Sequence, residues 1–192
     1  MVKTHKMTDD LFSKMNELAP AGGRLLLSPE QIDRRVAEMA EEISASMRDD
    51  SPWLVLGVLR GAFIFMADLV RKLKRAVAMD FIQISSYRDD TKNSAIELVK
   101  APTLNLRGRS LLLVDDILDT GNSMVWLVNY LDNQQVGCLR TCVLVDKPDC
   151  RQVKISADYV GFSLPPVFVV GYGLDAAQQY RQLPGIYQLP ED

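Results

Sequence analysis

The stretch of sequence that decides the fold runs from residue 111 to residue 123 and reads LLLVDDILDTGNS. Its first four residues are apolar without alternation, which is typical of a strand buried on both faces of a parallel sheet. Two carboxylates follow, Asp115 and Asp116, and a short turn over residues 119–121 leads into a helix that starts near Ser123. The stretch therefore predicts a buried strand, a tight polar turn and a helix.

Outward from this stretch, the chain continues to alternate between strand and helix patterns. A helix is predicted from Ser28, where the sequence Ser-Pro-Glu-Gln forms a capping box with proline in the first turn, and another over residues 62–74. Apolar runs predict further strands at residues 54–58, 81–85, 141–145 and 168–170. Residues 87–95 are charged and polar, so we expect a mobile loop or lid there. The alternation predicts an α/β fold with a mainly parallel twisted sheet flanked by helices, whose ligands bind beyond the carboxyl ends of the strands.

Composition excludes several classes of protein. The 192 residues carry a formal net charge of −3, with 47% hydrophobic and 24% charged residues, which favours one globular domain over a general nucleic-acid binder. No apolar run reaches the roughly 20 residues that a membrane span needs, and residues 1–14 lack the apolar segment of a secretory signal. The three cysteines lack metal-site spacing, and the single histidine, His5, lies in a polar segment. We therefore expect a cytoplasmic protein whose acid–base chemistry uses carboxylates or lysine.

The turn after the buried strand combines groups that suit a sugar phosphate. Small residues at positions 120, 121 and 123 allow backbone N–H groups to point into a concavity at a helix start, which is a ready site for a phosphate. The carboxylates beside it would repel a phosphate unless they face hydroxyl groups or a metal ion. Alone, the acidic pair would also fit an ordinary capped helix, or the magnesium strand of a nucleotide hydrolase. The phosphate loop of such hydrolases, G-x-x-x-x-G-K-[ST], is missing from the sequence.

As a whole, the segment 111–123 resembles the phosphoribosyl pyrophosphate signature of the type I phosphoribosyltransferases, in which four apolar residues and two acids precede an acid-Thr-Gly loop. Other segments resemble the hypoxanthine-guanine branch of that family. Residues 55–62 are similar to its pyrophosphate loop, residues 85–87 to the start of its catalytic lid, and residues 146–148 to its base-reading turn. Three more segments are similar to its purine hood, namely residues 158–162, 168–175 and 180–184.

The resemblance implies a binding role for each matching residue. Asp115 and Asp116 would face the ribose hydroxyls and their magnesium shell, and Asp175 would hold a second Mg²⁺. The 5-phosphate would lie on the loop formed by Asp119, Thr120, Gly121, Asn122 and Ser123. Pyrophosphate would be held by Arg181 and by the backbone of Leu59, Arg60 and Gly61. In the family, the peptide between the first two of these three tends to be cis.

Catalysis and base selection are implied in the same way. Asp119 resembles the general base that takes the purine N7 proton as N9 attacks carbon 1 of the ribose. Lys147 would donate to a 6-oxo group and so reject adenine, although Lys-Pro after a strand is otherwise typical of an exposed turn. Phe168 would stack on the purine while the Val169 carbonyl reads the ring edge, although a Phe in an apolar strand is otherwise a core residue.

An architecture and a set of partners also follow from the resemblance. Residues 1–192 would form a single phosphoribosyltransferase domain, with a core of about 45–165 and a hood of about 1–30 and 166–192. Ser86 and Tyr87 would close over the reacting centre and exclude water, whereas residues 88–93 fit a solvated loop better. The expected ligands are phosphoribosyl pyrophosphate, a purine base and Mg²⁺, in a homodimer or homotetramer that binds neither nucleic acid nor a membrane.

The predicted function is purine salvage, in which hypoxanthine or guanine receives ribose 5-phosphate to give IMP or GMP and pyrophosphate. The sequence departs from the family beside the base, with Pro165-Pro166-Val167 in place of Pro-Asp-Lys and Ala176 in place of an aromatic residue. A xanthine-preferring phosphoribosyltransferase therefore stays an alternative. Another alternative is a non-catalytic regulator on the same fold, which would need a basic surface or an added DNA-binding module. The negative net charge argues against a basic surface, and the short region before Ser28 leaves little room for an added DNA-binding module.

Overall fold

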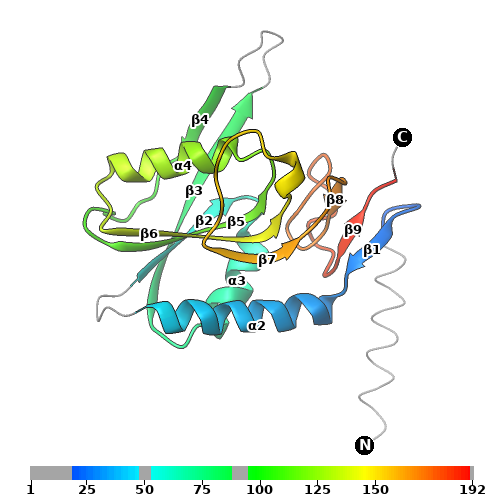
Figure 1. The fold of residues 1–192 in the computed structure, drawn as a ribbon, viewed down its shortest axis with the longest axis horizontal. Helices are drawn as coiled ribbons and strands as arrows, with labels where there is room; N and C mark the ends of the chain where they lie inside the picture. Colours follow the sequence, from blue (N-terminus) through cyan, green and yellow to red (C-terminus); the bar gives the residue numbers. More distant parts are fainter. Residues whose placement is uncertain (1–18, 48–52, 88–94, 191–192) are drawn as a thin grey trace, which may run out of the picture.

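The computed structural model describes residues 19–47, 53–87 and 95–190 of the chain and contains a larger and a smaller sheet (Figure 1). The larger sheet has the strand order β4 (Ala95–Lys100), β3 (Val77–Tyr87), β2 (Trp53–Leu59), β5 (Ser110–Leu118), β6 (Cys138–Asp146) and β7 (Tyr159–Ser163). The smaller sheet has the order β1 (Arg24–Leu27), β9 (Ile186–Gln188) and β8 (Val169–Val170). The helices are α2 (Pro29–Ser46), α3 (Phe63–Lys72) and α4 (Asn122–Asn133), with a 3₁₀ turn, η1 (Pro148–Cys150).

Helices cover both faces of the six-stranded sheet, with α2 and α3 below it and α4 above it in Figure 1. The side chains of β5 show why both faces must be covered. Leu112 and Val114 pack with α2 and α3, whereas Leu111 and Leu113 pack with α4, and all four are fully buried. Strand β5 pairs in parallel with both β2 and β6, and β3 pairs in parallel with β2. The predicted α/β fold with a mainly parallel sheet is confirmed.

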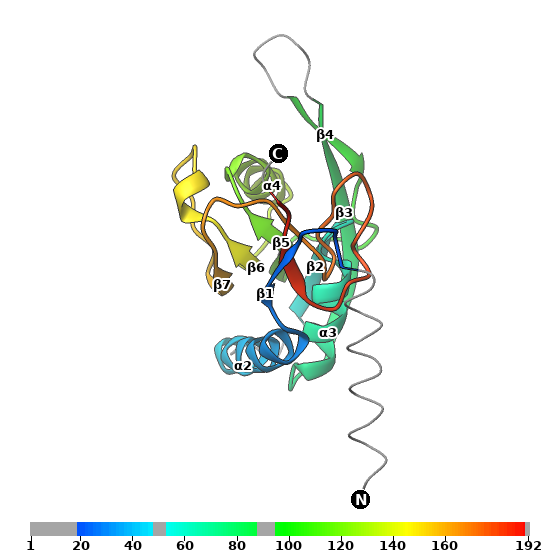
Figure 2. The same cartoon turned by 90° about the vertical axis from the view of Figure 1, so that its right-hand side faces the viewer.

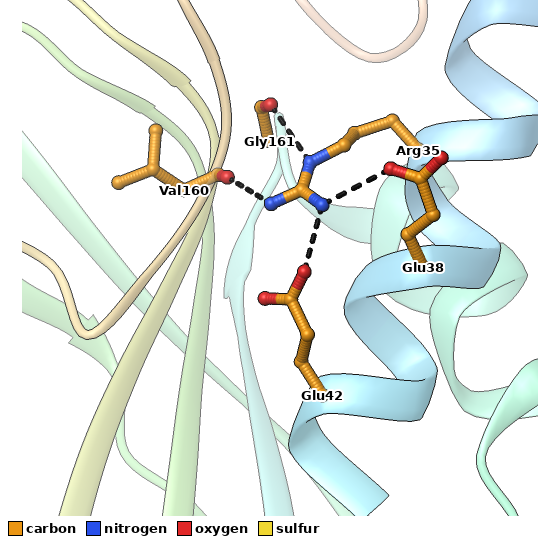
Figure 3. Close-up of polar contacts among 5 residues, drawn as sticks. All are labelled: Arg35, Glu38, Glu42, Val160 and Gly161. Atoms are coloured by element: carbon orange, nitrogen blue, oxygen red, sulfur yellow. Dashed lines mark hydrogen bonds and ion pairs between the residues drawn. The ribbon is translucent and has the colours of Figure 1, made fainter.

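Helix α2 begins as its sequence predicts. The Ser28 hydroxyl accepts from the backbone N–H of Gln31, and the Gln31 side chain accepts from the backbone N–H of Ser28, which completes the capping box. On the flank of the helix, Arg35 donates to the carbonyl oxygens of Val160 and Gly161 on β7 (Figure 3). These bonds occupy carbonyl groups on the last strand of the sheet, which would otherwise be an open edge.

The order of the strands creates a crevice between β2 and β5. The chain leaves β2 through α3 and returns on one side of the pair, whereas it leaves β5 through α4 and returns on the other side. The loops that follow these two neighbouring strands therefore diverge, and a ligand site is expected between them at the carboxyl ends of the strands. The small sheet β1–β9–β8 lies toward this end of the molecule (Figure 2).

Several expectations need correction. Strand β5 does not end at the acidic pair but continues to Leu118, because its parallel pairing with β6 continues to that residue. Residues 95–100 form β4, an antiparallel strand that was not predicted. Residues 159–163, whose sequence resembles part of the hood, form β7 of the large sheet, a strand that was not predicted. His5 and residues 88–94 of the expected lid lie outside the described residues. Within the described part of the chain, no helix is long and apolar enough to cross a membrane.

Candidate active site

A cavity of about 230 Å³ lies at the crevice between β2 and β5. Its wall is made by the ends of these two strands and by the loops that follow them. The lining residues from β2 and its loop are Val58, Leu59 and Gly61, and those from β5 and its loop run from Asp115 to Gly121. The peptide between Leu59 and Arg60 is cis, as the resemblance led us to expect. The position agrees with the general rule for open α/β sheets.

Two adjacent carboxylates form the floor of this cavity. Asp115 is 7% exposed, and its Oδ1 accepts from the backbone N–H of Asp116 at 3.0 Å. Burial and the neighbouring Asp116 charge raise the pKa of Asp115 well above its ordinary value. Burial also raises the pKa of Asp116, although the bond with Asp115 and the positive charge of Arg181 oppose it. A pair of this kind is stabilised by a ligand that brings hydroxyl donors or a cation.

The loop after β2 is wedged between β5 and the segment after β8. A Cβ added to Gly61 would lie 1.5 Å from Oδ2 of Asp116, so the carboxylate occupies the space of the missing side chain. On the other side, a Cβ added to Gly173 would lie 2.1 Å from the Gly61 carbonyl oxygen. Glycine thus lets the Asp116 carboxylate pack directly against the β2 loop on one side and the backbone at Gly173 pack against it on the other.

The loop after β5 has the shape of an anion site. Gly121 precedes the first turn of α4 with a φ of 91°, a left-handed conformation that glycine adopts readily, and no side chain caps the helix. The cavity is lined by Thr120, Gly121 and Ser123, beside the N-terminal end of the helix. Unpaired backbone N–H groups and the helix dipole both favour an anion at such a position.

Lys147 forms an ion pair with Asp119, which lines the cavity. The Lys147 side chain is only 6% exposed, and its Nζ lies 3.9 Å from Oδ2 of Asp119, whose side chain is 47% exposed. The exposed turn that Lys-Pro would otherwise suggest is thus excluded for this lysine. The distance of 3.9 Å is an ion-pair distance and too long for a hydrogen bond, so the buried ammonium can donate its protons to a ligand carbonyl.

Charged side chains from the segment after β8 extend over the β2 loop. The Arg181 guanidinium pairs with Asp175 at 2.6 Å and donates to the Gly173 carbonyl at 2.6 Å. Arg181 and Arg60 also donate to the same amide oxygen of Gln178, at 3.1 and 3.3 Å. Two guanidinium groups held at one neutral oxygen form a site suited to an anion that carries several negative charges.

The remaining predicted residues lie in two other places. Phe168 is 59% exposed just before β8, so it is not a core residue, and its carbonyl accepts from Leu189 N at 3.0 Å. Val169 is buried in β8. Ser86 and Tyr87 end strand β3, but their side chains lie outside what the structure describes.

Metal ligands do not gather into a ready-made cage. Among the described residues, no group of three or more His, Cys, Asp or Glu side chains could hold a metal ion. Asp175 pairs with Arg181 and accepts from the backbone N–H of Gln178, and it does not form one cluster with the acidic pair on β5. The carboxylates nonetheless suit Mg²⁺, which commonly uses one or two carboxylates and completes its shell with water and substrate phosphates.

Two residues of the site were not found in the sequence. Gln178 bridges Arg60 and Arg181, and Arg151 donates to the carbonyls of Leu118 and Asp119 behind the phosphate loop. No motif contains either contact. The only sequence signal for Arg151 is that a basic residue follows the Lys147 turn closely.

The fold and this site define a class of protein, and comparison with known families agrees. Residues 26–177 match the model of the phosphoribosyl transferase domain family, and the chain belongs to that family. It is 45% identical over 178 residues to the hypoxanthine-guanine phosphoribosyltransferase of Aquifex aeolicus, a match that covers 92% of this chain and 100% of that relative. It is 39% identical to the enzyme of the same name from Bacillus subtilis, covering 85% of this chain and 91% of that relative.

Solved structures give the same result. The chain superposes on a hypoxanthine phosphoribosyltransferase from Trypanosoma cruzi in complex with the product IMP, with a TM-score of 0.82 and 34% identity over 87% of this chain and 94% of that one. A hypoxanthine-guanine phosphoribosyltransferase from Bacillus anthracis also gives a TM-score of 0.82, with 38% identity over 86% of this chain and 98% of that one. The predicted membership of the type I phosphoribosyltransferases is confirmed.

Proposed function

We propose that this chain transfers the ribose 5-phosphate of phosphoribosyl pyrophosphate to hypoxanthine or guanine, giving IMP or GMP and pyrophosphate. The observation that carries the proposal is the combination, at one cavity, of an acidic pair, a helix-start anion site and a buried lysine facing Asp119. The names of the relatives support the same activity. A non-catalytic regulator would have no need for Lys147 and Asp119 in this arrangement.

Each part of the sugar pyrophosphate finds a group of matching chemistry. The 5-phosphate would accept from the loop of residues 119–123 at the start of α4. The ribose hydroxyls would donate to Asp115 and Asp116, which relieves the repulsion between the buried Asp115 and the half-buried Asp116. The pyrophosphate would lie near Arg60 and Arg181, which Gln178 holds together.

We propose Mg²⁺ as the cofactor. Asp115 and Asp116 would hold one ion through its water shell or the ribose hydroxyls, and Asp175 would hold a second. When bound, the ions neutralise the charge that builds on the leaving pyrophosphate. The absence of a three-carboxylate cage among the described residues fits ions that arrive with the substrate.

The chemical step is a displacement at carbon 1 of the ribose. Purine N9 forms the new bond, the bond to pyrophosphate breaks, and the electron pair leaves with pyrophosphate. Asp119, whose side chain lines the cavity and is 47% exposed, takes the proton from N7. Lys147 would donate to the 6-oxo group of the base, whereas an amino group at that position would offer its ammonium no acceptor. Phe168 would stack on the base, and Ser86 and Tyr87 would exclude water.

The base pocket leaves one specificity question. Pro165, Pro166 and Val167 stand beside Phe168, and Ala176 follows Asp175, where the family has larger or charged side chains. A xanthine-preferring transferase is therefore the second candidate. We also propose that the protein works in the cytoplasm, consistent with three free cysteines. We further propose that it forms a homodimer or homotetramer, for which exposed apolar side chains at Phe63, Met79 and Val99 offer contact surface.

The test of the mechanism is the variant Asp119→Asn, assayed with hypoxanthine, phosphoribosyl pyrophosphate and Mg²⁺. Loss of the Asp119 carboxylate, the general base, is expected to lower kcat about 10²- to 10⁴-fold. Binding of the sugar pyrophosphate should change little. Asp149→Asn is the matched control, because Asp149 is exposed on the neighbouring 3₁₀ turn and does not line the cavity. A wild-type protein that binds phosphoribosyl pyrophosphate but forms no nucleotide from any purine would favour the regulator.

A further inference from the structure

A segment behind the phosphate loop binds three successive carbonyl groups of that loop. The Leu118 carbonyl accepts from the backbone N–H of Lys147 at 3.0 Å and from Nη1 of Arg151 at 2.9 Å. The Asp119 carbonyl accepts from the same Nη1. The Thr120 carbonyl accepts from the backbone N–H of Gln152 at 2.9 Å. Residues 147–152 therefore bind the loop through its carbonyl groups, and none of these six residues lines the cavity.

Arg151 is itself held firmly. Its Nη2 pairs with the Asp146 carboxylate at the end of β6, and the two side chains are only 14% and 18% exposed. The Arg151 Cδ also lies close to Gly121, where an added Cβ would come within 3.0 Å of it. Charge-assisted bonds of a guanidinium are strong and directional, and here they are largely shielded from water.

The bonds on the carbonyl groups decide where the N–H groups point. Across a planar trans peptide, the C=O of one residue and the N–H of the next point in opposite directions. Because the carbonyls of residues 118–120 point toward Arg151 and Gln152, the N–H groups of residues 119–121 point away from the segment 147–152. All three of these residues line the cavity.

We propose that Arg151 is a positioning residue that orients the phosphate loop and the backbone of Asp119 before substrate binds. The proposal deepens the proposed function and rests on it. Arg151 does not line the cavity, so it acts only through the carbonyls of Leu118 and Asp119. Without it, the loop has to be ordered by the 5-phosphate itself, which weakens binding of the sugar pyrophosphate.

The chain contains a matched control for this guanidinium. Arg35 donates from Nε to the Gly161 carbonyl at 3.1 Å and from Nη2 to the Val160 carbonyl at 2.9 Å, and it pairs with Glu38 and Glu42 (Figure 3). It thus also binds two successive carbonyls and carboxylate partners, with a side chain that is 24% exposed. Its target is the edge strand β7, outside the residues that line the cavity.

The experiment compares Arg151→Ala, Arg151→Lys and Arg35→Ala with the wild type. The dissociation constant of phosphoribosyl pyrophosphate with Mg²⁺ is measured by calorimetry, KM and kcat are measured with hypoxanthine, and Tm is measured for each protein. Arg151→Ala is expected to weaken binding of the sugar pyrophosphate about 10- to 100-fold, because the Asp119 carbonyl loses its guanidinium donor and the Leu118 carbonyl keeps only the Lys147 N–H. Arg151→Lys keeps the positive charge but loses the paired N–H donors of the guanidinium, so its dissociation constant should lie between those of Arg151→Ala and the wild type. Added guanidinium ion should partly restore Arg151→Ala, whereas Arg35→Ala should lower Tm and leave the dissociation constant unchanged.

Two results would overturn the positioning role. One is a dissociation constant for Arg151→Ala equal to that of the wild type, and the other is an equal loss of binding in Arg35→Ala and Arg151→Ala. Failure of the proposed function is a separate result, because a wild type that forms no nucleotide contradicts that function while the binding measurement still tests Arg151.

Discussion

Replacing Gly61 with alanine is expected to abolish most activity by displacing one carboxylate. The new methyl group would lie 1.5 Å from Oδ2 of Asp116 and 2.3 Å from its Cγ, and real Cβ atoms essentially never approach heavy atoms closer than 3.0 Å. The carboxylate therefore has to withdraw by about 1.5 Å, since rigid backbone at Gly173 contacts the Gly61 carbonyl on the other side. A displacement of about 1 Å costs on the order of 10²-fold in rate, so we expect kcat/KM for phosphoribosyl pyrophosphate to fall at least about 100-fold.

The control is Gly57→Ala on β2, the strand that precedes the Gly61 loop. There the added Cβ would lie 2.3 Å from Sδ of Met66, the flexible side chain of a core residue that is able to shift. This variant should lose about 1–3 kcal/mol of stability through overpacking and keep kcat/KM close to that of the wild type. Initial rates and urea unfolding of both variants give the comparison. If Gly61→Ala keeps the wild-type kcat/KM, the assigned contact between the β2 loop and Asp116 is wrong.

Three further predictions concern the base, the metal and acid stability. Phe168→Ala removes a side chain that is 59% exposed, so Tm should change by less than about 2 °C while KM for hypoxanthine rises about tenfold through lost stacking. Chelation by EDTA should stop nucleotide formation, and added MgCl₂ should restore it. Although burial alone would raise the pKa of Asp80, hydrogen bonds from the Phe81 and Leu104 N–H groups and from Thr103 lower it below its ordinary value. The folded-state pKa is therefore below the unfolded one, so this stabilisation is complete above about pH 5 and is lost as pH falls below about 4. Asp80→Asn should lower Tm at pH 7, and the difference from the wild type should shrink on acidification; a constant difference would contradict the assignment.

The sequence alone predicts the parts of this fold that are specified locally. The apolar run at residues 111–114 reports burial on both faces, and the capping box at Ser28 gives the start of α2. Strand β4 is apolar at Ile96, Leu98 and Val99, but its residues 97–100 are exposed and its existence depends on antiparallel pairing with β3, which the sequence does not show. Strand β7 is only partly buried and was obscured by its likeness to the hood. Such strands are recognised by their partners rather than by their own composition.

In the candidate site, too, the residues adjacent in sequence could be predicted, whereas contacts between distant residues could not. Asp115, Asp116 and the turn at residues 119–121 are adjacent in sequence, and the structure brings them together at one cavity. Arg151 binds a carbonyl 33 residues away, and Arg60 and Gln178 are 118 residues apart. Because a backbone carbonyl has the same chemistry in every residue, a bond to it leaves no mark in the sequence of the acceptor. Contacts of this kind become visible only in three dimensions.

The most direct test of the central claim is the initial rate of nucleotide formation by the wild-type protein, with phosphoribosyl pyrophosphate, Mg²⁺ and one purine at a time. Hypoxanthine or guanine should be converted to the nucleotide with release of pyrophosphate, and adenine should be inert because Lys147 requires a 6-oxo acceptor. Conversion of adenine at a rate similar to that of hypoxanthine would contradict the role of Lys147. Formation of no nucleotide from any purine would contradict the transferase activity itself.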